Sequence, residues 1–171
     1  MENNQLHEIL KKLIGSRFVR VFSKGEKSNF KICHYYVYNT STPPQDGHFL
    51  AIYISAQRVY VFDSLAVNKY EYFEQHFPCH TKFTYVNNKK IQSEFSVICA
   101  LYVIYVIYNH SEGKTFEKIL KIFGLNRDLN DSVLYSWYIH NSFFNKFKFL
   151  TFTDSKTIKT LVKDLCKSHY K

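Results

Sequence analysis

The sequence predicts one α+β domain spanning residues 1–171, in which a mixed β-sheet is flanked by helices. The chain has 171 residues, an ordinary length for a single domain with a substantial core. Short β-prone runs are concentrated in the first half, and helical patterns dominate from Ser96 onward. Gly and Pro number only 5 and 3, and no internal repeat or low-complexity linker divides the chain.

The first half is expected to form one helix followed by several strands. Apolar residues at positions 6, 9, 10, 13 and 14 fall at helical spacing, and Gly15 can end that helix. The β-prone runs predict strands over 18–22, 32–38, 49–54 and 59–62, with 82–86 as a further candidate. A turn-rich loop at 41–47 and a tight turn at 56–57 connect strands, and a short helix is expected over 68–77.

The second half is expected to be helical over 96–111, 115–123, 129–144 and 154–168. The apolar run 95–108 would be about 21 Å long as a helix, whereas a bilayer core is about 30 Å thick. It is therefore expected to be a buried helix and not a membrane span. The first residues lack the apolar core of a signal peptide, so we expect a protein that is not secreted and whose cysteines stay reduced.

The formal net charge of +9 implies an anionic partner or environment, such as nucleic acid. The lysines are dispersed, however, as pairs at 11–12 and 89–90, at 146 and 148, and as a scatter near the C-terminus. A solvated basic surface and a nucleic-acid groove both remain open.

Cys99 lies near the start of the most apolar predicted helix. At that position the unpaired backbone N–H groups and the helix dipole favour an anion, and a thiolate is the reactive form of cysteine. The alternative is a buried structural cysteine, which is common in protein cores.

A cysteine nucleophile needs a base, and the base needs an orienting acceptor. His48 opens the strand predicted over 49–54, and Asp63 ends the strand predicted over 59–62. If these strands form a hairpin, the two side chains lie at the same end and within hydrogen-bonding reach. Alternatively, His48 is an ordinary surface histidine, and Asp63 caps a turn with Ser64.

Gln92 is a candidate oxyanion donor, because a neutral amide N–H₂ group near the thiolate could stabilise the negative oxygen formed during acyl transfer. Alternatively, Gln92 is simply a polar loop residue beside Lys89 and Lys90.

A Cys₂His₂ zinc site from the pairs at 33–34 and 79–80 is disfavoured, because adjacent residues on a strand point to opposite faces. No metal site is expected, and no required cofactor is indicated.

In the order His48, Asp63, Gln92 and Cys99, the chain resembles the adenovirus protease (adenain) group, which includes proteases of polinton-type elements and related large DNA viruses. The segments GHFLAIYI, VYVFDSLA and IQSEFSVICA carry the resemblance, together with Asn39-Thr40 and LYSWYIHNSFF at 134–144. The resemblance implies a cysteine endopeptidase that matures virion precursor proteins and prefers small residues, often glycine, around the cut. By matching positions it assigns Cys99 as nucleophile, His48 as general base and acid, Asp63 as orienter and Gln92 as oxyanion donor.

The chain departs from the family pattern at two positions. Phe49 stands in place of a tryptophan, and Ala100 in place of the glycine after the nucleophile, where the added methyl group could crowd the oxyanion. The resemblance also implies two possible activating cofactors, DNA and a short basic peptide attached through a cysteine. Cys79 is the nearest candidate for that thiol, although its offset differs from the family arrangement.

From the resemblance we expect a monomer, without a membrane partner, that acts on protein substrates in the virion or at assembly sites in the nucleus or cytoplasm. Proteases of SUMO and ubiquitin-like modifiers share the residue order and an Asp-Ser pair like Asp63-Ser64, so they are an alternative. A second alternative is a catalytically weakened DNA- or capsid-binding protein on the same scaffold.

Overall fold

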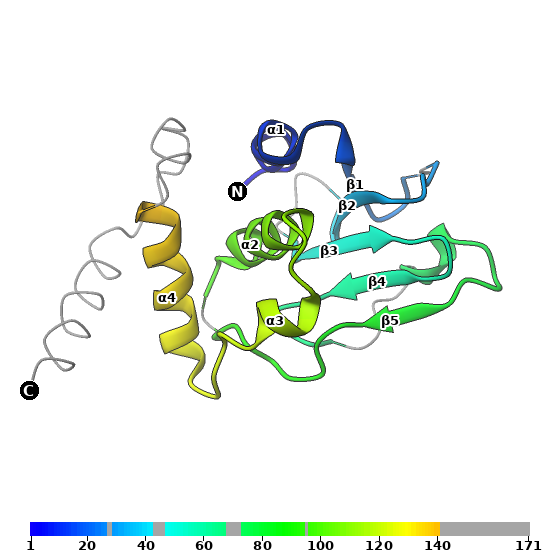
Figure 1. Cartoon of the computed structure of the whole chain (residues 1–171). Helices are drawn as coiled ribbons and strands as arrows, with labels where there is room; N and C mark the ends of the chain where they lie inside the picture. Colours follow the sequence, from blue (N-terminus) through cyan, green and yellow to red (C-terminus); the bar gives the residue numbers. More distant parts are fainter. Residues whose placement is uncertain (27–28, 43–46, 68–72, 95, 141–171) are drawn as a thin grey trace, which may run out of the picture.

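A computed structural model describes residues 1–26, 29–42, 47–67, 73–94 and 96–140. The first half contains α1 (Asn3–Ile14), the 3₁₀ turn η1 (Gly15–Arg17), β1 (Phe18–Ser23), β2 (His34–Asn39), β3 (Phe49–Ile54), β4 (Val59–Phe62), the 3₁₀ turn η2 (Glu74–His76) and β5 (Phe83–Tyr85). The second half contains α2 (Cys99–Ser111), α3 (Phe116–Leu120) and α4 (Arg127–His140). The predicted α+β class is confirmed (Figure 1).

The five strands form one mixed sheet in the order β1-β2-β3-β4-β5. The pairs β2–β3 and β3–β4 are antiparallel, and the edge strands β1 and β5 run parallel to β2 and β4. Parallel neighbours cannot be joined by a tight turn. The connections β1–β2 and β4–β5 are therefore long, whereas β3 and β4 form a hairpin.

Helices α1, α2 and α3 lie on one face of the sheet, and α4 packs against α2 beside them (Figure 1). Helix α2 lies against β3 and contacts α1, α3 and α4, and its residues from Cys99 to Ile107 are all buried. A helix that is apolar on every side needs such a position, because no face of it suits water. The opposite face of the sheet is covered by a second apolar cluster that includes Phe30, Phe73 and Phe77.

The structure corrects several predicted boundaries. The strand expected from residue 32 begins at His34, because Cys33 has a positive φ of 63° and turns the chain. The helix expected over 68–77 is only the 3₁₀ turn Glu74–His76 within the described residues. Helix α2 begins at Cys99 and not at 96, and α3 ends at Leu120 and not at 123. The helix expected over 154–168 lies outside the described residues.

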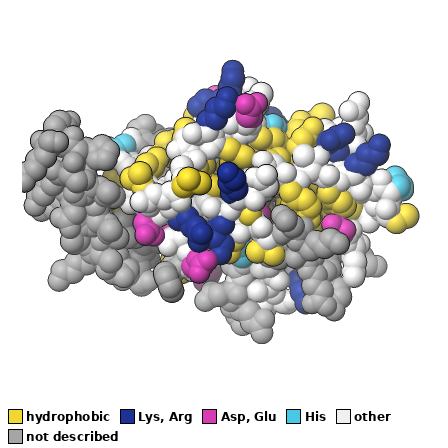
Figure 2. Space-filling model, turned by 90° about the horizontal axis from the view of Figure 1, so that it is seen from below, with side chains coloured by type: hydrophobic (Ala, Val, Ile, Leu, Met, Phe, Trp, Pro, Cys, Tyr) yellow, Lys and Arg dark blue, Asp and Glu magenta, His cyan; other side chains and the backbone are white. Residues whose placement is uncertain are grey.

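The surface in Figure 2 shows Lys and Arg side chains in separate groups, with acidic and hydrophobic side chains between them. The basic side chains visible on this face therefore do not line up as one stripe. None of the helices in the described ranges combines the length and the apolar character needed to cross a membrane.

Candidate active site

The hairpin register brings His48 and Asp63 to the same end of the sheet. Ala51 of β3 pairs with Phe62 of β4, so the residue before β3 and the residue after β4 are neighbours. The imidazole Nε2 of His48 lies 2.6 Å from Oδ1 of Asp63. An ionised carboxylate only accepts hydrogen bonds, so Nε2 carries the proton that it donates. The predicted pairing is confirmed.

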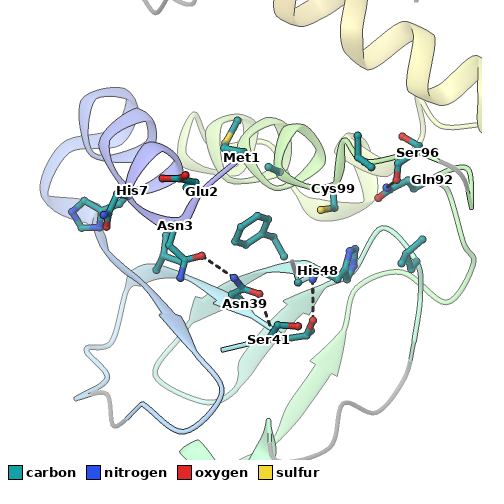
Figure 3. A pocket seen from close by; sticks show the side chains of 18 of the residues that line it. Met1, Glu2, Asn3, His7, Asn39, Ser41, His48, Gln92, Ser96 and Cys99 are labelled. Atoms are coloured by element: carbon teal, nitrogen blue, oxygen red, sulfur yellow. Dashed lines mark hydrogen bonds between the residues drawn. The ribbon is translucent and has the colours of Figure 1, made fainter. Parts of the chain in front are cut away.

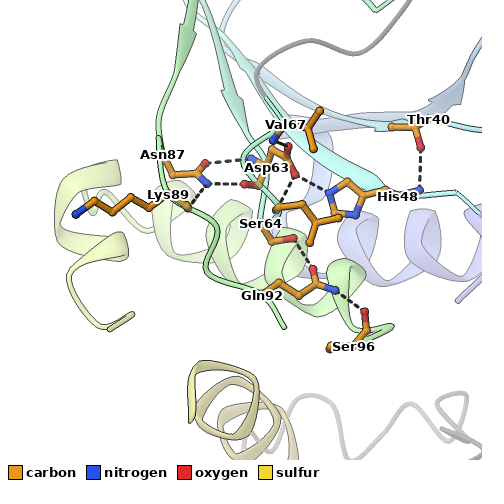
Figure 4. Close-up of polar contacts among 10 residues, drawn as sticks. Thr40, His48, Asp63, Ser64, Val67, Asn87, Lys89, Gln92 and Ser96 are labelled. Atoms are coloured by element: carbon orange, nitrogen blue, oxygen red, sulfur yellow. Dashed lines mark hydrogen bonds and ion pairs between the residues drawn. The ribbon is translucent and has the colours of Figure 1, made fainter. Parts of the chain in front are cut away.

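Asp63 is 2% exposed, and its carboxylate also organises the turn that follows β4 (Figure 4). Oδ1 accepts a hydrogen bond from the Leu65 N–H at 2.9 Å, and Oδ2 accepts one from the Val67 N–H at 2.6 Å. The Asp63 side chain therefore has both roles at once: it orients His48 and it caps the turn. From the sequence, these two roles were expected to be alternatives.

Asn87, which follows β5, holds the backbone on either side of the Asp63 side chain. Its Oδ1 accepts from the Asp63 N–H at 3.1 Å, and its Nδ2 donates to the Asp63 carbonyl oxygen at 2.5 Å. The parallel pairing of Val61 with Tyr85 places the asparagine there. The Asn87 side-chain amide thus continues the hydrogen bonding between β4 and β5 by one more residue. It holds the backbone of Asp63 in place.

His48 is anchored through its backbone to the end of β2. The His48 N–H donates to Thr40 Oγ1 at 2.9 Å, and the Thr40 N–H donates to the His48 carbonyl at 3.0 Å (Figure 4). Gly47 lies against the same strand end, where an added Cβ atom would stand 1.8 Å from Asn39 Oδ1. Only glycine fits this position without moving the segment that presents the imidazole.

Cys99 is the first residue of α2 and is 9% exposed. Its side chain lines the same cleft as His48 and is close enough to interact electrostatically with the imidazole. Asp63 occupies Nε2, so Nδ1 is the nitrogen left for the sulfur. Burial lowers the pKa of His48, but the hydrogen bonds and negative charges of Asp63 and Cys99 outweigh burial and raise this pKa to about 9. The protonated imidazole is therefore favoured at neutral pH.

Gln92 is 2% exposed and both ends of its amide are held (Figure 4). Ser64 Oγ donates to its Oε1 at 2.6 Å, and its Nε2 donates to the Ser96 carbonyl oxygen at 2.7 Å. An amide nitrogen carries two N–H bonds. Within the described chain Ser96 takes one of them, and the other suits a ligand in the adjoining cleft.

His48, Gln92 and Cys99 line one cleft of about 1030 Å³ (Figure 3). Phe49 and Ala100, the two departures from the family pattern, also line it and are 4% exposed each. The cleft continues past the thiol toward α1, whose first residues form the far wall. Its volume is close to the upper end of the range of about 300–1,000 Å³ that is typical of ligand pockets.

Two residues that support the site had no role in the sequence prediction: Asn87 and Ser96. Ser64 was noted only as part of the Asp-Ser pair. Its position directly after Asp63 could have indicated a second polar contact. Asn87 and Ser96 lie in loops, so no local pattern reveals their contacts.

The remaining candidates lie elsewhere. Cys79 is exposed and does not line the cleft, so its role as an activating-peptide thiol stays a prediction. Cys33, the other cysteine of the disfavoured Cys₂His₂ zinc site, is also exposed. Among the residues that the structure describes, no group of three His, Cys, Asp or Glu side chains could hold a metal ion.

The arrangement contains the groups that nucleophilic acyl transfer requires. A thiol at a helix N-terminus interacts with an imidazole, a buried carboxylate hydrogen-bonds that imidazole, and an amide group lines the same cleft. No protein-family model matches this chain, and no curated protein is significantly similar to it in sequence.

Proposed function

We propose that the protein is a cysteine endopeptidase with Cys99 as nucleophile, and that its fold is of the adenain type. The observation that carries the proposal is the line from Cys99 through His48 to Asp63, in which the first two groups share one cleft and interact electrostatically and the last two are hydrogen-bonded. The hydrogen-bonded histidine could equally be part of a polar core network. However, a network that ends in a thiol at the wall of a large cleft favours catalysis.

The reaction follows from the protonation states. In the protonated state that the raised pKa of His48 favours, the proton from Cys99 is already on Nδ1, and Asp63 stabilises this imidazolium through Nε2. The thiolate attacks the scissile carbonyl carbon, and the Gln92 N–H with the backbone N–H of Cys99 binds the negative oxygen. His48 then gives its proton to the leaving amine. Water activated by His48 hydrolyses the thioester and restores the thiol.

The substrate class comes from the resemblance to the adenain group. Virion precursor proteins would be the substrates, and DNA or a basic peptide could act as activator. The net charge of +9 supports binding to a polyanion. A virion or an assembly site would be the place of action.

The decisive experiment compares thiol labelling with peptide cleavage. Iodoacetamide should label Cys99 far faster than the exposed Cys33 and Cys79, and His48→Ala should abolish the difference. Candidate virion precursors should be cut by the wild type, with and without DNA, and not by Cys99→Ala. Equal labelling of the three cysteines, or cleavage that survives Cys99→Ala, would refute the proposal.

A second candidate is a protease of a ubiquitin-like modifier. It is supported by the Asp63-Ser64 pair, in which the serine holds Gln92 through a 2.6 Å hydrogen bond. Hydrolysis of a fluorogenic modifier ending in diglycine, in the absence of virion-precursor cleavage, would favour this candidate.

A further inference from the structure

Helix α4 lies against the segment that carries Gln92. Asn130, which is 3% exposed, donates from Nδ2 to the Ile91 carbonyl oxygen at 3.0 Å. Arg127 forms an ion pair with Glu94 at 3.2 Å, but both side chains are well exposed, so this pair contributes little. The buried polar contacts therefore decide how this helix holds the segment.

Asp131 makes the most connected of these contacts. Its carboxylate accepts from the Tyr102 hydroxyl at 2.7 Å and from the Ser93 N–H at 3.4 Å, and it interacts electrostatically with the Ser96 side chain. These partners come from α2 and from both ends of the segment 93–96. An ionised carboxylate offers two acceptor oxygens, whereas an amide offers one and an alkyl side chain none.

Ser96 connects this carboxylate to the amide of Gln92. Its side chain interacts with Asp131, and its backbone carbonyl accepts the Gln92 Nε2–H at 2.7 Å. Together with the Ser64 hydroxyl on Oε1, that carbonyl fixes the rotation of the amide plane. It thereby determines where the second N–H points.

We propose that Asp131 is a positioning residue for the oxyanion donor, acting through Ser96 to hold the Gln92 amide. This inference rests on the proposed function, and it adds α4 to the groups that control the reaction. Asp131 does not line the cleft, so it contacts no substrate.

The test is a double-mutant cycle on the full-length protein. Asp131→Ala should lower kcat for a cleaved precursor peptide about 10-fold to 100-fold, less than the loss of about 10²–10³-fold for removing an oxyanion donor itself. KM should change less than about twofold, because the amide acts on the transition state. In a Gln92→Ala background, Asp131→Ala should cost almost nothing more. Asp128→Asn, an exposed carboxylate on the same helix, is the control.

Alkylation of Cys99 by iodoacetamide separates positioning from general damage, because this reaction forms no oxyanion. Its rate should stay at the wild-type value in Asp131→Ala. Where that variant does not fold, Asp131→Asn, which keeps one acceptor oxygen, should give a smaller loss of kcat. An unchanged kcat, a full additional loss in the Gln92→Ala background, or a parallel loss of alkylation would overturn the proposal.

Side-chain amide NMR tests the relay without relying on cleavage. The Gln92 N–H that binds Ser96 should exchange slowly with solvent in the wild type and at least about tenfold faster in Asp131→Ala. Unchanged exchange would refute the relay even in an active enzyme. Changed exchange in a protein that cuts no peptide would refute the proposed function alone.

Discussion

Replacing Asp63 by asparagine should lower the pKa of His48 and move the pH range in which the site works. In the wild type this pKa is raised from 6.5 to about 9. A rise of about 2.5 pH units corresponds to about 3 kcal/mol in favour of the imidazolium. The variant loses the carboxylate's charge, whereas the burial that opposes protonation remains. We expect the pKa of His48 to fall by about 1–3 pH units.

The same substitution should destabilise the turn after β4. The Val67 N–H donates to Asp63 Oδ2 at 2.6 Å, and an amide nitrogen at that position cannot accept it. Leaving this donor unpaired should cost about 1–3 kcal/mol, measurable as a lower midpoint of urea unfolding.

The assay is the alkaline limb of the pH profile of kcat/KM, which reports groups of the free enzyme. It should lie near pH 9 in the wild type, because above that pH His48 no longer protonates the leaving amine. In Asp63→Asn it should move to lower pH. Glu117→Gln, a carboxylate with a side chain 78% exposed, should leave it in place. A folded Asp63→Asn protein with its alkaline limb still near pH 9 would refute the proposed coupling.

The free energy of unfolding should also depend on pH through the titration of His48. The folded pKa of His48 lies above the unfolded value, so protonation stabilises the fold. The contribution of about 3 kcal/mol is complete below pH 6.5 and is lost as pH rises to about 9. Urea unfolding of the wild type and of His48→Gln at pH 6 and pH 10 would measure it. A wild-type advantage that does not shrink at pH 10 would contradict the assignment.

Two further changes test how the site is held. Gly47→Ala should lower kcat/KM about 100-fold, because the new methyl group overlaps Asn39 Oδ1 and displaces the loop that presents the base. Gly124→Ala, where the methyl group meets no atom within 4 Å, should have no such effect, and equal activities would contradict the steric explanation. Ser64→Ala should lower kcat about tenfold at constant KM, because the Gln92 amide loses the donor to its oxygen. Steady-state kinetics would show this, and a changed KM alone would contradict it.

Local sequence patterns predicted much of the fold. The β3–β4 hairpin and the start of a helix close to Cys99 follow from β-prone runs, a tight turn and a long apolar run, all of which act over neighbouring residues. The helix expected over 68–77 was largely wrong within the described residues. In its C-terminal part, Phe73 and Phe77 fill the space under the sheet, and tertiary packing overrides the helical pattern.

The candidate site divides in the same way. His48 and Asp63 could be paired in advance, because a hairpin register follows from the lengths of two adjacent strands and their turn. The approach of Cys99 to His48 depends on how α2 packs on the sheet. The resemblance to the adenain group supplied that expectation, and in the structure the two side chains line one cleft and interact electrostatically.

By itself, the sequence determined which segments form the hairpin and the apolar helix, and which side chains could act as nucleophile, base and oxyanion donor. Only the tertiary structure decided how those side chains are held. Asn87 reaches Asp63 through parallel strand pairing, and Asp131 reaches the Gln92 segment through helix packing. Periodicity reports the local conformation of each segment, whereas contacts between residues far apart in the chain depend on how all the segments pack together.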